Sequence, residues 1–236
     1  MTNLTIRHPL LRTTIAIVLG LLILMIAGQS MMSISKSTQL FENFPMIEKT
    51  FTHTAMLVLS VLFMLILNKG NLRAYGFTWN LNFPLTKTVL ISLIIGLTAA
   101  LMQNLLITTK VELSVNDFSF LESILYVWIW ASICEEVLTR GLIQGFLTPL
   151  KHIGLTVFKY HISLPVIVGA LFFGAMHLAI LTMGADIKMV LLIVFFAIIL
   201  GLIAGYLKEK TNSLVPAILV HFCFNVGGSF LSLVDV

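Results

Sequence analysis

Several polar side chains lie in stretches of the sequence that are otherwise apolar: Glu135, Glu136, Arg140, His177, His221 and Asn225. Glu136 and Arg140 are four residues apart, as are His221 and Asn225, and this spacing puts both members of a pair on one face of a helix. Charges inside a membrane are costly, at roughly 2.5 to 3.5 kcal/mol each at a helix centre on insertion scales. We therefore expect these side chains to face protein or water, and the other apolar stretches hold almost no such groups.

The same residue types are those that hydrolysis of an amide bond requires. The reaction needs a base to deprotonate water, a donor to the tetrahedral oxyanion and an acid for the leaving amine. A carboxylate held away from bulk water is a stronger base than an exposed one, and a nearby Arg can keep it ionised. Histidine can transfer protons and asparagine can donate to an oxyanion. The set could equally hold zinc through Glu135, His177 and His221 with a position open for water, so the sequence leaves both chemistries possible.

The two adjacent carboxylates are predicted to differ. Successive helix positions turn by about 100°, so Arg140 lies about 40° around the helix from Glu136 and about 140° from Glu135. Glu136 is therefore the expected partner of Arg140, and Glu135 is free to face the cavity. A purely structural ion pair would leave the second carboxylate and both histidines unexplained.

The composition predicts an all-α polytopic membrane bundle. Charged residues make up 10% of the chain and hydrophobic residues 58%, whereas soluble domains have roughly a quarter charged residues. Uncharged tracts recur with lengths near the roughly 20 residues that cross a hydrocarbon core. About seven transmembrane helices are predicted, over residues 13–35, 50–68, 88–109, 118–150, 164–183, 189–207 and 213–233. The segment 36–49 suits either an interfacial helix or a loop.

The predicted helices form one membrane domain, residues 1–236, with a catalytic core over 118–230. At about 1.5 Å per residue, Glu135 and His177 would lie roughly 20 Å from the cytoplasmic boundary, His221 about 12 Å and Asn225 about 18 Å. The site is therefore expected to be buried between helices four, five and seven.

The distribution of Lys and Arg predicts a multi-pass protein of the cell membrane with a cytoplasmic N-terminus. With that orientation, the inner segments hold Arg7, Arg12, Lys69, Arg73, Lys87, Lys151, Lys159, Lys208 and Lys210, and the outer ones hold Lys36, Lys49, Lys110 and Lys188. No basic cluster is present, so no nucleic-acid partner is expected. The first tract is read as a retained helix because no small-residue cleavage site follows it. The two cysteines lie in apolar tracts and predict no disulfide framework.

Common hydrolase signatures are missing from the sequence: there is no His-Glu-x-x-His, no Gly-x-Ser-x-Gly and no pair of intramembrane aspartates. Three other motifs are present in order. Residues 135–140 match Glu-Glu-x-x-x-Arg, residues 173–177 match Phe-x-x-x-His, and residues 221–225 match His-x-x-x-Asn. With these motifs on successive apolar helices, the chain resembles the CAAX protease and bacteriocin-processing family, also called the Abi family, of intramembrane proteases. The resemblance covers about residues 118–230.

The resemblance implies a membrane endopeptidase that cleaves membrane-associated peptides or proteins, of CAAX type or of bacteriocin or pheromone type, within the lipid bilayer. It implies that Glu135 activates water together with His177, and that His221 and Asn225 form the oxyanion site. Glu136 and Arg140 would support them. The family is often labelled a metalloprotease, and a glutamate mechanism without metal is also argued, so the resemblance leaves zinc open.

Two other classes of protein fit some of the residues. A proton-coupled transporter also places Glu and His within the membrane, but it predicts inverted repeats and broken helices, and neither is evident in the sequence. A non-catalytic immunity or scaffold protein could retain an old active site. A cleavage assay with co-expressed membrane peptides separates that protein from an enzyme.

Overall fold

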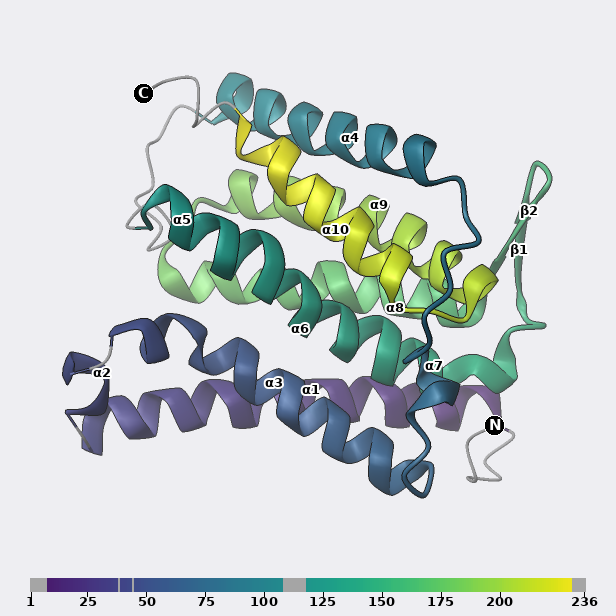
Figure 1. Ribbon diagram of the computed structural model, residues 1–236, viewed down its shortest axis with the longest axis horizontal. Helices are drawn as coiled ribbons and strands as arrows, with labels where there is room; N and C mark the ends of the chain where they lie inside the picture. The colour runs from purple at the N-terminus through teal and green to yellow at the C-terminus, as the bar shows by residue number, and fades with distance from the viewer. Residues whose placement is uncertain (1–7, 38, 44, 108–117, 231–236) are drawn as a thin grey trace.

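The computed structural model describes residues 8–230 except 38, 44 and 108–117, and it is a bundle of helices, as predicted (Figure 1). The N-terminal half contributes α1 (Pro9–Ser37), the short α2 (Leu40–Asn43), α3 (Pro45–Leu67), a 3-10 turn (Leu72–Tyr75) and α4 (Leu85–Leu106). The C-terminal half contributes a long helical stretch from Phe120 to Leu150, then α8 (Leu164–Met176), α9 (Ile187–Thr211) and α10 (Val215–Gly228). The alternative that segment 36–49 holds a helix is correct for α2, and α3 begins within that segment.

The stretch from Phe120 to Leu150 is one helix whose hydrogen-bonding pattern changes along its length. It runs through α5 (Phe120–Glu122), a π-helical segment (Ser123–Ala131), α6 (Ser132–Glu136), a second π-helical segment (Val137–Ile143), α7 (Gln144–Leu147) and a 3-10 turn (Thr148–Leu150). Glu135 and Glu136 thus end the α-helical turn between two wider segments. Because π-helical turns are rare and concentrate at functional sites, this helix is a candidate location for the active site. We call it the central helix.

Five described helices are long and apolar enough to cross a membrane, and the chain is a multi-pass membrane protein. Their bounds are Pro9–Lys36, Met46–Leu67, Leu85–Leu106, Leu164–Met183 and Ile187–Thr211. Two of the helices observed in the structure differ from the spans predicted for them. The span predicted over 213–233 is a helix of only 14 residues, Val215–Gly228, shorter than the roughly 20 residues of a full crossing, and its last three predicted residues lie outside the described part of the chain. The predicted span 118–150 is the interrupted central helix.

The segment between the central helix and α8 forms a feature that the sequence did not reveal. Strands β1 (Gly154–Val157) and β2 (Tyr160–Ser163) pair antiparallel, with Leu155 opposite Ile162. The hairpin projects away from the helices (Figure 1). Its apolar and polar residues alternate over only four positions per strand, too few for the sequence pattern to separate a strand from a loop.

The central helix lies inside the bundle. Every described residue from Cys134 to Leu147 is buried, because α1, α3 and α8 pack around its middle and α10 packs against α6. The larger apolar core forms around it and includes Ile23, Met64, Leu138, Leu142 and Phe146. A second core joins α8, α9 and α10 and includes Phe173, Leu200 and Val220. Charges on the central helix are therefore shielded from lipid by protein.

Helices α4 and α10 approach each other very closely (Figure 1). A Cβ atom at Gly96 would overlap the carbonyl oxygen of Phe224, and one at Gly227 would overlap the carbonyl oxygen of Leu93. Small residues let two membrane helices pack backbone against backbone. This contact fixes α10, the helix that carries the third motif.

Candidate active site

The predicted ion pair on the central helix is present and fully buried. Nη1 of Arg140 lies 2.9 Å from Oε1 of Glu136, and neither side chain is exposed. The same carboxylate oxygen lies 3.1 Å from Nδ1 of His221 on α10. Because an ionised carboxylate only accepts hydrogen bonds, Nδ1 of His221 is the donor in this contact. Glu136 therefore links the first and third motifs.

Glu135 points to a different set of partners. Its Oε1 lies 3.1 Å from Nε2 of His53 on α3, and its Oε2 lies 3.9 Å from Nε2 of His221. The second distance is too long for a direct hydrogen bond. The Glu135 side chain is 12% exposed, in contrast to the wholly buried Glu136. The two adjacent carboxylates thus differ in the way that their helix positions predict.

His177 begins a change of helix type at the end of α8. The α-helix ends at Met176 and a 3-10 segment continues over His177–Met183. Nδ1 of His177 lies 2.8 Å from the carbonyl oxygen of Phe173, and a carbonyl can only accept, so Nδ1 carries the proton. In the neutral ring Nε2 is then free to accept a proton.

Phe173 is the centre around which the motif residues pack. Its ring meets the rings of His177 and His221 edge to face, with centroids 5.1 and 5.3 Å away. The guanidinium carbon of Arg140 lies 4.4 Å from the centroid of the same ring. Such a cation–π contact is stronger when water is excluded. The phenylalanine of the second motif thus positions the charged residue of the first motif and both histidines.

Asn225 lies one turn beyond His221 on α10 and bonds to the central helix. Its Nδ2 atom lies 3.1 Å from the carbonyl oxygen of Val127 and 3.2 Å from Oγ of Ser132. The Val127 carbonyl needs a donor, which fixes the orientation of the amide. Both amide hydrogens are used in these contacts, so an oxyanion would compete with Val127 and Ser132 for Asn225.

Four buried polar atoms at the site lack a hydrogen-bond partner within the described part of the chain: Oε2 of Glu135, Oε2 of Glu136, and Nε and Nη2 of Arg140. Buried polar groups are nearly always paired with protein or water, and internal waters are the usual partners where protein atoms are not. A Cβ atom at Gly201 on α9 would come within 2.9 Å of Nη2 of Arg140. The absence of a side chain there leaves room for the guanidinium.

The described residues do not fit the zinc shell that the sequence allowed. No group of three or more His, Cys, Asp or Glu side chains within 8–37, 39–43, 45–107 and 118–230 is arranged to hold a metal ion. Nε2 of His221 and Oε2 of Glu135 lie 3.9 Å apart, but no third His, Cys, Asp or Glu side chain in those ranges completes a metal-binding group with them.

His53 is the site residue that the sequence reasoning missed. The first three spans were expected to hold almost no polar groups at depth, yet α3 brings this histidine to Glu135. A depth calculation could have found it, because His53 lies three residues inside the predicted outer boundary, about 22 Å from the inner one. That depth is close to the roughly 20 Å expected for Glu135.

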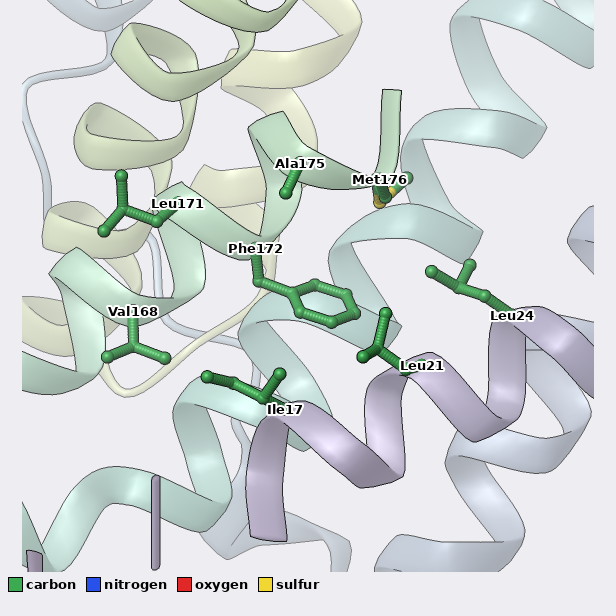
Figure 2. A pocket seen from close by; sticks show the side chains of 8 residues that line it. All are labelled: Ile17, Leu21, Leu24, Val168, Leu171, Phe172, Ala175 and Met176. Carbon is green, nitrogen blue, oxygen red and sulfur yellow. The ribbon is translucent and has the colours of Figure 1, made fainter. Parts of the chain in front are cut away.

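An apolar pocket of about 330 Å³ lies between α1 and α8, and none of the polar motif residues lines it (Figure 2). Its lining residues are Ile17, Leu21, Leu24, Val168, Leu171, Phe172, Ala175 and Met176. Phe172 points into this pocket from α8 (Figure 2), whereas its neighbour Phe173 packs against His221 and Arg140. The pocket has no group that could activate water, so it is not the site of the chemistry.

One known family matches the part of the chain that carries the three motifs. The model of the Rce1-like type II CAAX prenyl endopeptidase family matches residues 117–227, a segment that contains all three motifs and leaves out α1, α3 and α4. No curated protein and no solved structure matches the chain. Residues 117–227 are a domain of the Rce1-like CAAX prenyl endopeptidase family, which also carries the names CPBP and Abi.

Proposed function

We propose that this protein is an intramembrane endopeptidase that hydrolyses peptide bonds of membrane-associated peptides or proteins with water activated by Glu135. The observation that carries the proposal is the set of contacts that the two oxygens of the Glu135 carboxylate make. Oε1 is held by His53, while Oε2 is buried, has no hydrogen-bond partner among the described residues and lies 3.9 Å from Nε2 of His221. A water at an ordinary distance of about 2.8 Å can contact both atoms at once.

The proposed reaction begins with proton transfer from that water to Oε2 of Glu135. The resulting hydroxide forms a bond to the carbonyl carbon of the substrate, and the carbonyl oxygen becomes an oxyanion. Glu135 then gives the proton to the amide nitrogen, and the bond between carbon and nitrogen breaks. Proton transfer by a positioned side chain contributes roughly 10²- to 10⁴-fold to such reactions. Nε2 of His177, which is the acceptor in the neutral ring because Nδ1 donates to Phe173, can assist by accepting a hydrogen bond from the water.

The oxyanion needs donors close to the reacting bond. Nε2 of His221 faces the space beside Glu135 and can donate to the oxyanion when it carries a proton. Asn225 lies on the same face of α10, and it would have to exchange one of its present bonds, to Val127 or to Ser132, for one to the oxyanion. Removing one such donor costs about 10²- to 10³-fold in kcat in well-studied hydrolases. Glu136 and Arg140 do not contact the substrate in this proposal; they hold His221 and Phe173 in place.

The substrate proposed is a peptide presented at the membrane, of CAAX type, as the family description suggests, or of bacteriocin or pheromone type. Purified protein in proteoliposomes should be incubated with prenylated CAAX peptides and with unprenylated membrane peptides, and mass spectrometry should identify new termini. Cleavage by wild-type protein that is lost in Glu135→Gln supports the proposal. Equal cleavage by the variant would mean that Glu135 is not the base, and no cleavage of either set would contradict the substrate class.

A further inference from the structure

We propose that His53 is a positioning residue for the reaction, supplied by the N-terminal helices from outside the family-matched segment. This inference rests on the proposed role of Glu135 as base. The contact that motivates it joins Nε2 of His53 on α3 to Oε1 of Glu135 at 3.1 Å. None of the three family motifs includes this histidine, and residues 117–227 do not reach it.

The contact determines which carboxylate oxygen can act. The terminal torsion of a glutamate side chain is broad and only weakly restricted, so an unrestrained carboxylate would present either oxygen at many angles. A hydrogen bond from Nε2 of His53 to Oε1 fixes the plane of the group. Oε2 is then the oxygen that faces His221. A catalytic group displaced by about 1 Å can lose 10²-fold in rate, so this restraint has a direct kinetic consequence.

Other contacts hold α3 in the register that this geometry needs. Nζ of Lys49 lies 2.9 Å from Oε1 of Glu122, and Nε1 of Trp130 donates to Oγ1 of Thr54 at 3.2 Å. Further along, Met64 packs beside Gly141, where an added Cβ would lie 3.6 Å from the Met64 sulfur. The central helix and α3 therefore contact each other on both sides of His53 along α3. These contacts hold His53 next to Glu135.

The same interface supplies a matched control. Thr54 is adjacent to His53 and bonds to the central helix, but its partner is Trp130 and not Glu135. A variant at Thr54 weakens the packing of α3 without changing the carboxylate. If His53 only held helices together, the variants at both positions would behave alike.

The experiment measures kcat, KM and thermal stability for His53→Phe, His53→Gln and Thr54→Val in proteoliposomes. Phenylalanine keeps the ring but removes the donor, and we expect kcat to fall about 10- to 100-fold with KM unchanged within about threefold. Glutamine places an amide donor near the position of Nε2 and should restore most of kcat. Thr54→Val removes one of several contacts between the two helices and leaves those of Lys49 and Met64 in place, so it should keep the wild-type kcat. Should His53→Phe fail to fold, His53→Ala is assayed with added imidazole, which should restore kcat.

Three outcomes would overturn the inference: wild-type kcat in His53→Phe, equal losses in His53→Phe and Thr54→Val, or no recovery with glutamine or imidazole. Glu135→Gln, measured alongside, separates this inference from the proposed function. An active Glu135→Gln refutes the proposed base. An inactive Glu135→Gln together with a fully active His53→Phe refutes only the role of His53.

Discussion

The guanidinium of Arg140 lies 2.9 Å from the carboxylate of Glu136, one helical turn earlier, and both side chains are completely buried. Desolvating two charges is favourable only when their geometry is good and further hydrogen bonds satisfy them. Here His221 shares the carboxylate and Phe173 lies beneath the guanidinium. The pair therefore connects the central helix to α8 and α10, and its removal should affect the whole site.

We expect Glu135→Gln and Glu136→Gln to fail in different ways. Glu135→Gln removes the proposed base with little change in shape, so the protein should stay folded in detergent, still bind substrate and lose turnover by about 10²- to 10⁴-fold. Glu136→Gln leaves Arg140 buried without its counter-charge, at a cost of about 3 to 5 kcal/mol. Thermal unfolding and a cleavage assay on both variants check this. Two stable but inactive variants would contradict the supporting role of Glu136.

A methyl group at Gly96 should displace α10. Gly96→Ala places a Cβ atom against the Phe224 carbonyl, and overpacking of this kind typically costs about 1 to 3 kcal/mol. Because α10 carries His221, activity should fall together with the unfolding temperature. Gly28→Ala on α1 is the matched control, since an added Cβ there meets nothing within 4 Å. Equal stability of the two variants would show that α4 and α10 do not need this close approach.

Activity should resist metal chelators. The residues described by the structure include no group of three ligands arranged for a metal, and the proposed reaction uses protein groups alone. Metal analysis of purified protein should find less than one equivalent of zinc, and treatment with a chelator should leave the cleavage rate unchanged. Loss of activity on chelation, with recovery on adding zinc, would refute this prediction.

The positive charges predict that Lys151 is cytoplasmic and Lys188 is external. Both residues are exposed, and the native Cys134 and Cys223 are buried, so single engineered cysteines should label over a low background. An impermeant thiol reagent added to intact cells should modify Lys188→Cys and spare Lys151→Cys. The opposite pattern would place the N-terminus outside.

The sequence by itself determined the class of fold and identified the side chains that could take part in a reaction. In a membrane, the backbone N–H and C=O groups of an apolar tract can find partners only in helices or closed barrels. The tract lengths fit helices, so the positions of α1, α3, α4 and α9 followed to within a few residues. The pairing of Glu136 with Arg140 also followed, because it depends on the local geometry of one helix.

Only the tertiary structure decided which groups meet. The contact of His53 with Glu135 joins residues 82 positions apart, and no local periodicity encodes the distance between two helices. The structure also showed that the amide hydrogens of Asn225 bond to Val127 and Ser132, and that α10 is short. Local spacing fixes the face of a helix, whereas packing against neighbouring helices fixes what that face contacts. For that reason the sequence indicated candidate residues and their helix faces, and only the fold showed that His53 of α3 contacts Glu135.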